Sequence, residues 1–403
     1  MFPLYLALPN VYSDYVISVF AINDATNAVV STVPVVLDPM GERGGPGMAL
    51  LCPTNGLYAY YDSALPHGVN GSGDPKMFVD LAGHTYSFGY TAKDPTSMPR
   101  WTEDGLQLTH SRDERFWCMT NAFQKAIGSH GVWTIQSSFT PSANCYVDEE
   151  HPGVFGGHEG SNGIIFGQLD GGNFYFSVCG AGRNIPKADM PPNVRTVVTL
   201  TGSPTQYVLY KDNQQYGNVI TPPANASTIP SPRNSAIGTA YVNGGRTWDG
   251  YLDYVRIYTN VLNAAELANL HQLDLIRQGK KVALDFRRLV YTGHGVKGKV
   301  SLAFGTDRSL DLWVVCGPEY ANCDIAQWPY HRKLATFDPT ASGKKVSFAA
   351  DGFTKDMDIR YVRFVLLPAG TAEERLTDLG AWCQSCYVPD MRYQPDGTLV
   401  FVR

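Results

Sequence analysis

The carboxylates of this chain form no pattern typical of a hydrolase. The densest acidic cluster, Asp148-Glu149-Glu150-His151, is followed by Pro152 and Gly153, which predict a loop. Neighbouring loop side chains spread in different directions, whereas glycoside cleavage needs two carboxyl groups held on either side of one bond. The Gly-x-Ser-x-Gly and His-Glu-x-x-His motifs are also absent from the sequence. We therefore expect a protein without enzymatic activity.

Aromatic and amide side chains in expected loops favour sugar binding instead. Glycan sites place aromatic rings against apolar sugar faces and use polar side chains for the hydroxyls. The candidate platforms and their polar partners are Trp101, Trp117, Tyr241 and Trp248, with His158, Asn162 and Asn243. The Gly-rich stretch 155–163 would let the backbone approach a ligand closely. The alternatives are that each aromatic packs in the core and that this stretch is only a hairpin turn.

Four aspartates could bind a calcium ion, which takes carboxylate and carbonyl oxygens. They are Asp62, Asp80, Asp170 and Asp253, and we take Asp62 and Asp253 as the first candidates for metal ligands. Asp62 stands at the end of an expected strand. The alternative for Asp253 is that its carboxylate orders its own turn through backbone hydrogen bonds.

Eight cysteines divide evenly along the chain, four in the first two thirds and four in the last third. This split is compatible with disulfides inside each part, and so with an oxidising compartment. The last four, Cys316, Cys323, Cys383 and Cys386, could also hold zinc as thiolates. The gap between Cys316 and Cys323 is wider than the usual ligand spacing, so we expect disulfides and calcium as the only cofactor.

The composition is that of a turn-rich β protein with an uncharged polar surface. The 403 residues are enough for two or three domains, and a hydrophobic share of 44% can build their cores. Charged residues reach only 17%, and the net charge of -5 gives no basic surface for nucleic acid. No apolar run approaches the roughly 18 residues of a membrane helix. We expect neither a nucleic-acid partner nor a membrane span.

Residues 1–50 predict an N-terminal β-arm that ends in a Gly-rich linker. The strand candidates Tyr15–Ile22 and Ala28–Leu37 are rich in β-branched residues, and the stretch Gly41–Gly47 punctuates the chain. Two strands are too few to be stable alone, and open apolar strands need partners. We expect residues 1–45 to pair either with their own domain or with a neighbouring subunit, which would make the protein self-associate.

The remainder predicts two β-sandwiches. Residues 51–278 hold short strands with alternating apolar and polar positions, separated by turn residues, as in antiparallel sandwiches. One helix is expected, because Asn263 and Glu266 form a capping box before an apolar stripe that stops at Gly279. Residues 279–403 predict a second, smaller sandwich. The chain is therefore expected to be all β.

The segment Trp248–Tyr258, followed by Val261–Leu267, resembles the closing strand and helix of laminin-G-like domains in the concanavalin A-like lectin/glucanase superfamily. That family pattern runs Gly-x-(Ile/Leu)-Asp-x-(Val/Leu)-Arg-(Ile/Val)-Tyr, then a Glu-containing helical turn. Asp253 occupies the aspartate position of that pattern. Gly56–Asp62 is similar to the opening strand of the family and Gly131–Pro141 to its central strand. The resemblance implies a jelly roll of two antiparallel sheets with one concave face.

The resemblance also bears on function. Glucanases of this superfamily share a Glu-x-Asp-x-x-Glu strand, and no Glu-x-Asp triplet occurs in this sequence. The last third resembles the small β-domain that follows laminin-G-like domains in large bacterial surface proteins, through Leu312–Gly317, Trp328 and Tyr361–Leu366. Together these imply an extracellular or cell-surface adhesion protein that binds a glycan or glycoprotein. The alternative is a structural subunit of a surface filament, built through N-terminal strand exchange.

Overall fold

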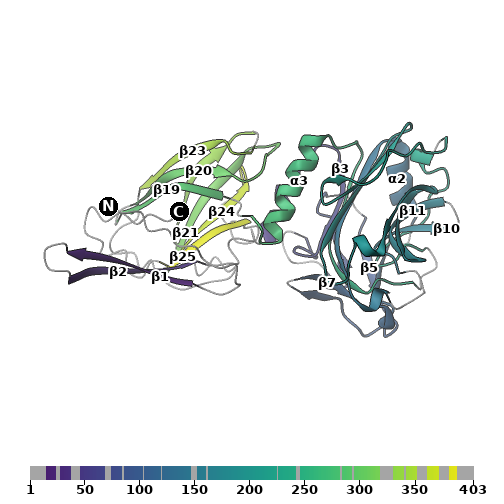
Figure 1. The fold of residues 1–403 in the computed structure, drawn as a ribbon, viewed down its shortest axis with the longest axis horizontal. Coiled ribbons are helices and arrows are strands. Elements are labelled where there is room, and N and C mark those ends of the chain that lie inside the picture. Colours follow the sequence, from purple (N-terminus) through teal and green to yellow (C-terminus); the bar gives the residue numbers. More distant parts are fainter. Residues whose placement is uncertain are drawn as a thin grey trace. The chain divides into compact units, whose positions relative to one another are not determined.

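The structure, a computed structural model, describes residues 15–23, 28–37, 46–68, 74–83, 86–102, 104–118, 120–146, 152–159, 162–224, 226–241, 246–281, 284–292, 295–317, 330–339, 342–351, 361–371 and 381–387. The chain divides into two compact units. One is Pro53–His271, and the other joins Met1–Cys52 with Gln272–Arg403. Antiparallel sheets dominate both units (Figure 1), which confirms the predicted all-β fold.

The unit Pro53–His271 is a sandwich of two eight-stranded sheets. Sheet 1 runs in the order β13 (Ala181–Pro186), β12 (Asn173–Val178), β11 (Asn162–Asp170), β10 (Phe155–Glu159), β17 (Ser235–Ile237), β8 (Arg115–Cys118), β5 (Phe88–Thr91) and β4 (Met77–Phe78). Sheet 2 runs β16 (Gln214–Gln215), β15 (Tyr207–Lys211), β14 (Thr196–Gly202), β9 (Trp133–Pro141), β18 (Gly250–Tyr258), β7 (Gly105–Leu108) and β6 (Arg100–Thr102), with β3 (Leu57–Asp62) paired to β18.

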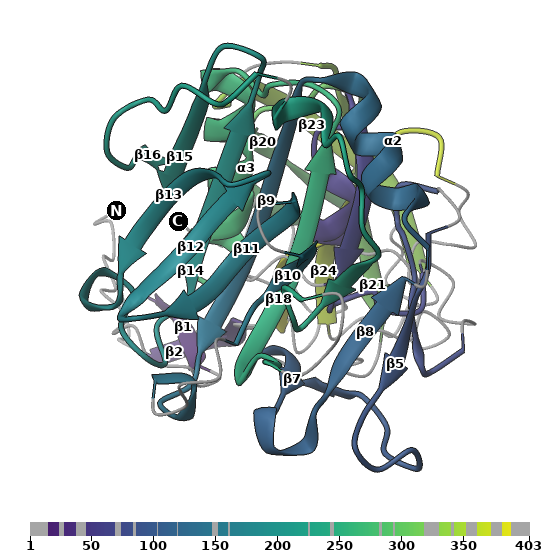
Figure 2. The ribbon, with the colours of Figure 1, turned by 90° about the vertical axis from the view of Figure 1, so that its right-hand side faces the viewer.

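The core of this unit lies between the two sheets, because alternate residues of each strand point inward. In β8, Phe116 and Cys118 are buried while Arg115 and Trp117 are half-buried. The same alternation buries Phe174 and Phe176 in β12. Each such large apolar side chain stabilises the fold by roughly 1.5–3 kcal/mol. Figure 2 looks onto sheet 1 from its outer face, the face turned away from sheet 2.

Helix α3 (Ala264–Arg277) begins as the sequence predicts. The side-chain oxygen of Asn263 accepts hydrogen bonds from the backbone N–H of Ala265 (2.9 Å) and Glu266 (3.0 Å). The Glu266 carboxylate accepts the Asn263 N–H at 2.8 Å, which completes the capping box. Single 3-10 turns occupy Pro46–Leu51 (η1), His110–Arg112 (η2), Asn144–Tyr146 (η3), Lys187–Asp189 (η4) and Ala226–Thr228 (η5).

The expectation of a single helix is wrong, because Ala122–His130 forms a second one, α2. It is nine residues long, contains Gly128 and buries only Phe123 and Ile127 among its large apolar side chains. Glycine normally disfavours a helix interior. A Cβ at Gly128 would lie 2.9 Å from that of Ile229, so tertiary packing requires the residue that weakens the sequence signal.

The second unit holds a six-stranded and a three-stranded sheet. The larger runs β1 (Tyr15–Asn23), β2 (Ala28–Leu37), β25 (Ala381–Tyr387), β24 (Tyr361–Pro368), β21 (Leu310–Gly317) and β22 (Tyr330–Phe337). The smaller runs β19 (Leu284–Thr292), β20 (Gly295–Leu302) and β23 (Lys345–Asp351). Arg308 fastens η1 to this unit by donating to the carbonyl oxygens of Leu50 and Cys52, the latter at 3.0 Å.

The expected disulfides are not present among the cysteines whose side chains the structure describes. Cys52, Cys118, Cys145 and Cys179 are not cross-linked. Burial raises the pKa of the Cys118 and Cys179 thiols, which disfavours their reactive thiolate forms. Of the last four cysteines, Cys323 lies outside the described residues, as does Trp328.

Candidate functional site

The most distinctive polar surface of sheet 1 begins where residues 238–241 pack against β10. Gly238 donates its N–H to the Val154 carbonyl (2.7 Å), and His158 donates its N–H to the Ala240 carbonyl (3.0 Å). A Cβ at Gly153 would lie 2.6 Å from the Cβ of Ala240, so only glycine leaves room for this segment. The segment thereby delivers Tyr241 beside His158, with which it forms an isolated bridge.

Three side chains then stack on one another. The rings of Tyr241 and His158 are 4.1 Å apart between centroids, and the Arg246 guanidinium carbon lies 3.9 Å from the Tyr241 centroid. His158 is buried, and its Nε2 lies 3.2 Å from the Gln168 side-chain oxygen. Tyr241 and Arg246 are half-buried. A guanidinium over an aromatic ring is attracted to the negative face of the ring. No carboxylate among the described residues pairs with Arg246.

The stack continues across sheet 1 through directly paired residues. Tyr175 lies between the core residues Phe174 and Phe176, so its side chain is on the outer face. It pairs with Gln168 on β11 and Asn184 on β13, and direct cross-strand partners share a face. Tyr175 is half-buried and Asn184 is exposed. We call the six residues Arg246, Tyr241, His158, Gln168, Tyr175 and Asn184 the outer strip.

Trp117 lies on the same outer face but on a more distant strand. In register it is opposite Ala236, which in turn is opposite Gly156 on β10. Its ring is half-buried, and the Arg115 guanidinium carbon lies 5.5 Å from the ring centroid. Of the predicted ligand-binding residues, Trp117, His158 and Tyr241 therefore share one face.

The other predicted ligand-binding residues do not join them. Trp248 is fully buried, with its ring 5.3 Å from that of Phe139, and is a core residue. Trp101 packs against the core, with its ring 5.1 Å from that of Phe78. Asn162 is in the β10–β11 hairpin and directly precedes Gly163, the residue paired with His158. Successive strand residues point to opposite faces, so Asn162 lies on the face opposite to that of His158. Asn243 and the acidic cluster 148–151 lie outside the described residues.

The predicted calcium ligands are buried and hydrogen-bonded to protein groups. Asp62 accepts the Ala64 N–H at 2.9 Å and the Tyr60 hydroxyl proton. Asp253 forms an ion pair with Arg195 at 2.7 Å and accepts the Ser138 hydroxyl. Asp80 accepts the Tyr60 N–H at 2.7 Å. In the described part of the chain, no three acidic, His or Cys side chains gather as a metal cluster. Calcium binding stays a prediction.

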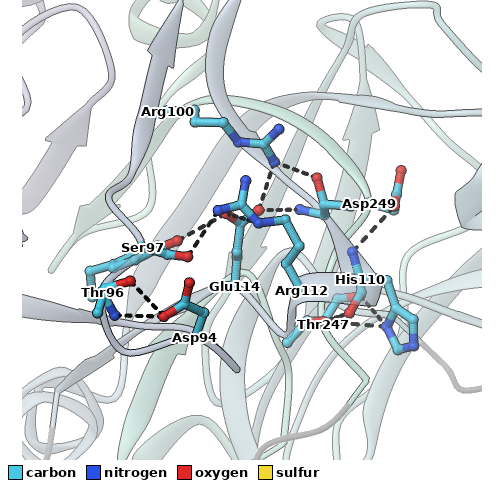
Figure 3. A network of polar contacts seen from close by, with 11 residues as sticks. Asp94, Thr96, Ser97, Arg100, His110, Arg112, Glu114, Thr247 and Asp249 are labelled. Carbon is cyan, nitrogen blue, oxygen red and sulfur yellow. Dashed lines mark hydrogen bonds and ion pairs between the residues drawn. The ribbon is translucent and has the colours of Figure 1, made fainter.

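Sequence reasoning missed a polar network around Glu114, whose carboxylate is fully buried (Figure 3). Arg100 pairs with one carboxylate oxygen at 2.7 Å and Arg112 with the other at 3.4 Å. The same carboxylate accepts the Tyr90 hydroxyl and the Thr109 N–H, each at 2.9 Å. A single glutamate next to two arginines gave no motif, because its partners come from separate strands and turns.

The network extends to the residues that follow Arg246. His110 donates its N–H to the Asp249 carboxylate at 3.2 Å, and its Nδ1 lies 3.1 Å from the Thr247 carbonyl oxygen (Figure 3). Asp249 also accepts the Ser142 hydroxyl. Hydrogen bonds to a carboxylate are stronger than neutral ones. The network thus fixes residues 247–249, one end of the loop that carries Arg246.

Comparison with known proteins finds a family match for part of this sandwich. Residues 122–268 match the concanavalin A-like lectin/glucanases superfamily. The predicted resemblance is thereby confirmed over that range, whereas the likeness of the last third to bacterial surface domains is not confirmed. No curated protein matches the sequence. None of the helices in the described ranges is long and apolar enough to span a membrane.

Several solved structures are similar to the chain at low identity. A Trypanosoma rangeli sialidase in complex with sialic acid is 17% identical, with a TM-score of 0.41, over 66% of this chain and 45% of that one. Domain 4 of an extracellular arabinanase from Geobacillus stearothermophilus, in complex with arabinotriose, is 12% identical, with a TM-score of 0.32, over 53% of this chain and 98% of that one. The chain spans 34% of the length of one of the first two sialidases and 45% of the length of the other.

The expectation that this protein has no enzymatic activity requires correction. It rested on the missing Glu-x-Asp triplet, on the absent Gly-x-Ser-x-Gly and His-Glu-x-x-His motifs and on the loop position of the acidic cluster. Each of these patterns marks one enzyme class, so their absence does not exclude catalysis of another kind, and sialidases are among the similar solved structures. That similarity does not make this chain an enzyme.

Proposed function

We propose that the outer strip binds a glycan. The observation that carries this proposal is the stack of Arg246 on Tyr241 on His158, continued by Gln168, Tyr175 and Asn184 across one sheet face. Sugar recognition needs an aromatic surface for C–H groups and fixed donors and acceptors for hydroxyls. Tyr175 supplies the half-buried ring, while Asn184 and Arg246 supply polar groups on either side.

Stacking gives Arg246 the fixed geometry that a binding site requires. Its guanidinium is held by the Tyr241 ring, and the Tyr241 ring rests on a buried imidazole. A donor that is already ordered loses less conformational entropy when a ligand binds. The side-chain oxygen of the buried Gln168 lies within hydrogen-bonding distance of His158 Nε2 and holds the imidazole in place. His158, Tyr241 and Arg246 are therefore ordered before a ligand binds.

A glycan array probed with the full chain tests the proposal. We expect one group of related glycans to bind, and Arg246→Ala and Tyr175→Ala each to weaken that binding by about tenfold or more, since the loss of one good polar or stacking contact amounts to about 1.4 kcal/mol. Arg332→Ala is the matched arginine control, because Arg332 is exposed and lies in the other unit. Tyr210→Ala, on sheet 2, is the tyrosine control.

Repeating the array with calcium and with a chelator tests whether the calcium ion proposed at Asp62 and Asp253 is required for glycan binding. Binding that persists in the chelator would reject a calcium requirement and leave the outer strip as the site. No binding across the array, or binding that survives both strip substitutions, would contradict the glycan proposal. A glycan ligand is displayed at cell surfaces, so we also propose an extracellular or cell-surface location.

A further inference from the structure

The N-terminal arm contains a hairpin at the edge of the six-stranded sheet. β1 and β2 pair along their whole length, from Tyr15 opposite Leu37 to Asn23 opposite Ala28. Among the residues that the structure describes, β2 pairs with β25 at Leu37 opposite Cys386. Figure 1 shows the two strands, in purple, as a ribbon of their own. Isolated two-stranded hairpins are marginally stable at best in water.

Both faces of this hairpin are apolar by sequence and register. Neither strand contains a charged residue. One face carries Tyr15, Ile17, Val19, Val33, Val35 and Leu37 with one serine, Ser31, and the other carries Val16, Phe20, Ile22, Val29 and Val36 with Ser18 and Thr32. A ribbon with one wet face would alternate apolar and polar residues. The pattern is that of a strand pair covered on more than one side.

The two long edges of the hairpin differ in how well they are protected. β2 contains Pro34, which has no N–H to donate and discourages another strand from pairing there. β1 contains no proline, glycine or charge, and it is the terminal strand of the six-stranded sheet, with no described strand on its outer side. The only irregularity in its register lies near the turn, between Ala21 and Ile22. Within the described ranges, the segment Tyr15–Phe20 is therefore a regular edge that no other strand covers.

We infer that β1 pairs with β1 of a second copy of this chain, antiparallel about a two-fold axis. In such a pair the residue on the axis lies opposite its own copy and its neighbours lie opposite nearby residues of the copy, so charges of one sign near the centre would repel one another. The uncharged sequence of β1 meets that condition without any complementary partner. The pairing would join two six-stranded sheets into one continuous sheet and satisfy the open edge of each.

A charge-swap experiment tests the inference. Val19 is the central residue of β1. We expect the full chain to sediment as a dimer, and Val19→Lys and Val19→Glu each to sediment as monomers, because like charges then oppose each other across the axis. An equimolar mixture of the two variants should recover a dimer, with the mass of a heterodimer by native mass spectrometry. Recovery by mixing also shows that neither substitution merely unfolds the hairpin.

Val194→Lys is the matched control, because Val194 is 48% exposed in the other unit and should leave the dimer intact. A wild-type chain that stays monomeric at high micromolar concentration would overturn the inference. So would dimers that persist in both Val19 variants. Monomers that bind phosphatidylcholine vesicles through residues 1–45 would overturn it in favour of a lipid partner for the same hairpin.

Discussion

Tyr241 can lie over His158 because Gly153 has no side chain. The segment that carries Tyr241 comes so close to β10 that a Cβ at Gly153 would meet both the backbone nitrogen and the Cβ of Ala240 at 2.6 Å. Neither of these atoms can move without moving residues 238–241. The geometry of the stack therefore depends on Gly153, which lies two residues before β10 begins at Phe155.

We predict that Gly153→Ala destabilises the protein by about 1–3 kcal/mol, as overpacking of a well-packed site does. It should also abolish glycan binding at the outer strip, since Tyr241 and Arg246 would be displaced together. Chemical denaturation and the glycan array measure the two effects. Gly89→Ala on the same sheet is the control, because its Cβ would meet the Met77 sulfur at an ordinary 3.7 Å. Equal behaviour of the two variants would refute the packing argument.

At this scale the sequence pointed to some residues of the strip and not to others. His158 and Tyr241 were candidates because aromatic and polar residues beside loops are typical of sugar sites. Tyr175 was missed, although it alternates with Phe174 and Phe176 in β12. That alternation already places it on the outer face. Arg246 gave no signal, because its stacking depends on a loop conformation that local sequence does not determine.

Among the elements, the strands around Glu114 are held by charge rather than by apolar contact alone. Arg100 on β6, Thr109 before η2 and Tyr90 on β5 all direct a donor to one buried carboxylate. Arg112 contributes a second guanidinium. Glu114 itself precedes β8, the strand that carries Trp117. The carboxylate thus fixes the position of four segments at once.

We predict that Glu114→Gln unfolds at lower denaturant concentration than the parent chain, with a loss of about 3 kcal/mol, the lower end of the cost of breaking a buried ion pair. The lower end applies because the side chains of Arg100 and Arg112 remain 33% and 40% exposed, so water solvates part of their charge. Asp104→Asn, an exposed carboxylate, is the control and should change stability little. A Glu114→Gln variant that is as stable as the parent chain would show that apolar packing alone holds these strands.

The elements themselves were largely predictable, for reasons that differ between them. β2 has its predicted bounds, and the capping box of α3 forms as the residue types require. These signals are local, because alternation and capping depend on residues a few positions apart. α2 was missed because it contains Gly128, which disfavours a helix. The glycine is required there because Ile229, which is distant in sequence, packs closely against it. For the first four cysteines the disulfide expectation is wrong, because an even cysteine count says nothing about spatial proximity. For the last four it stays a prediction.

At the scale of the whole molecule, the many tyrosines govern how the fold responds to alkaline pH. Burial raises the pKa of Tyr58, Tyr61, Tyr90, Tyr146, Tyr207 and Tyr210, all in the unit Pro53–His271. For Tyr90 the hydrogen bond to the Glu114 carboxylate acts in the same direction. Burial and a 2.6 Å hydrogen bond to Asp189 raise the pKa of Tyr216 to about 12. In the unfolded chain these phenols titrate near pKa 10.

We therefore predict that the tyrosine contribution to stability is constant below a pH of about 10 and falls steadily above it, because the unfolded chain then loses phenolic protons that the folded chain retains. Where the unfolded state binds fewer protons than the folded state, raising the pH favours unfolding. Denaturation midpoints across this range measure the fall, and ultraviolet absorbance of phenolate shows which state has ionised. Tyr216→Phe removes one of the responsible groups, so its stability should fall less steeply with pH than that of the parent chain. Phenolate that forms near pH 10 in a chain that is still folded would contradict the argument, since it would mean that burial does not keep these tyrosines protonated.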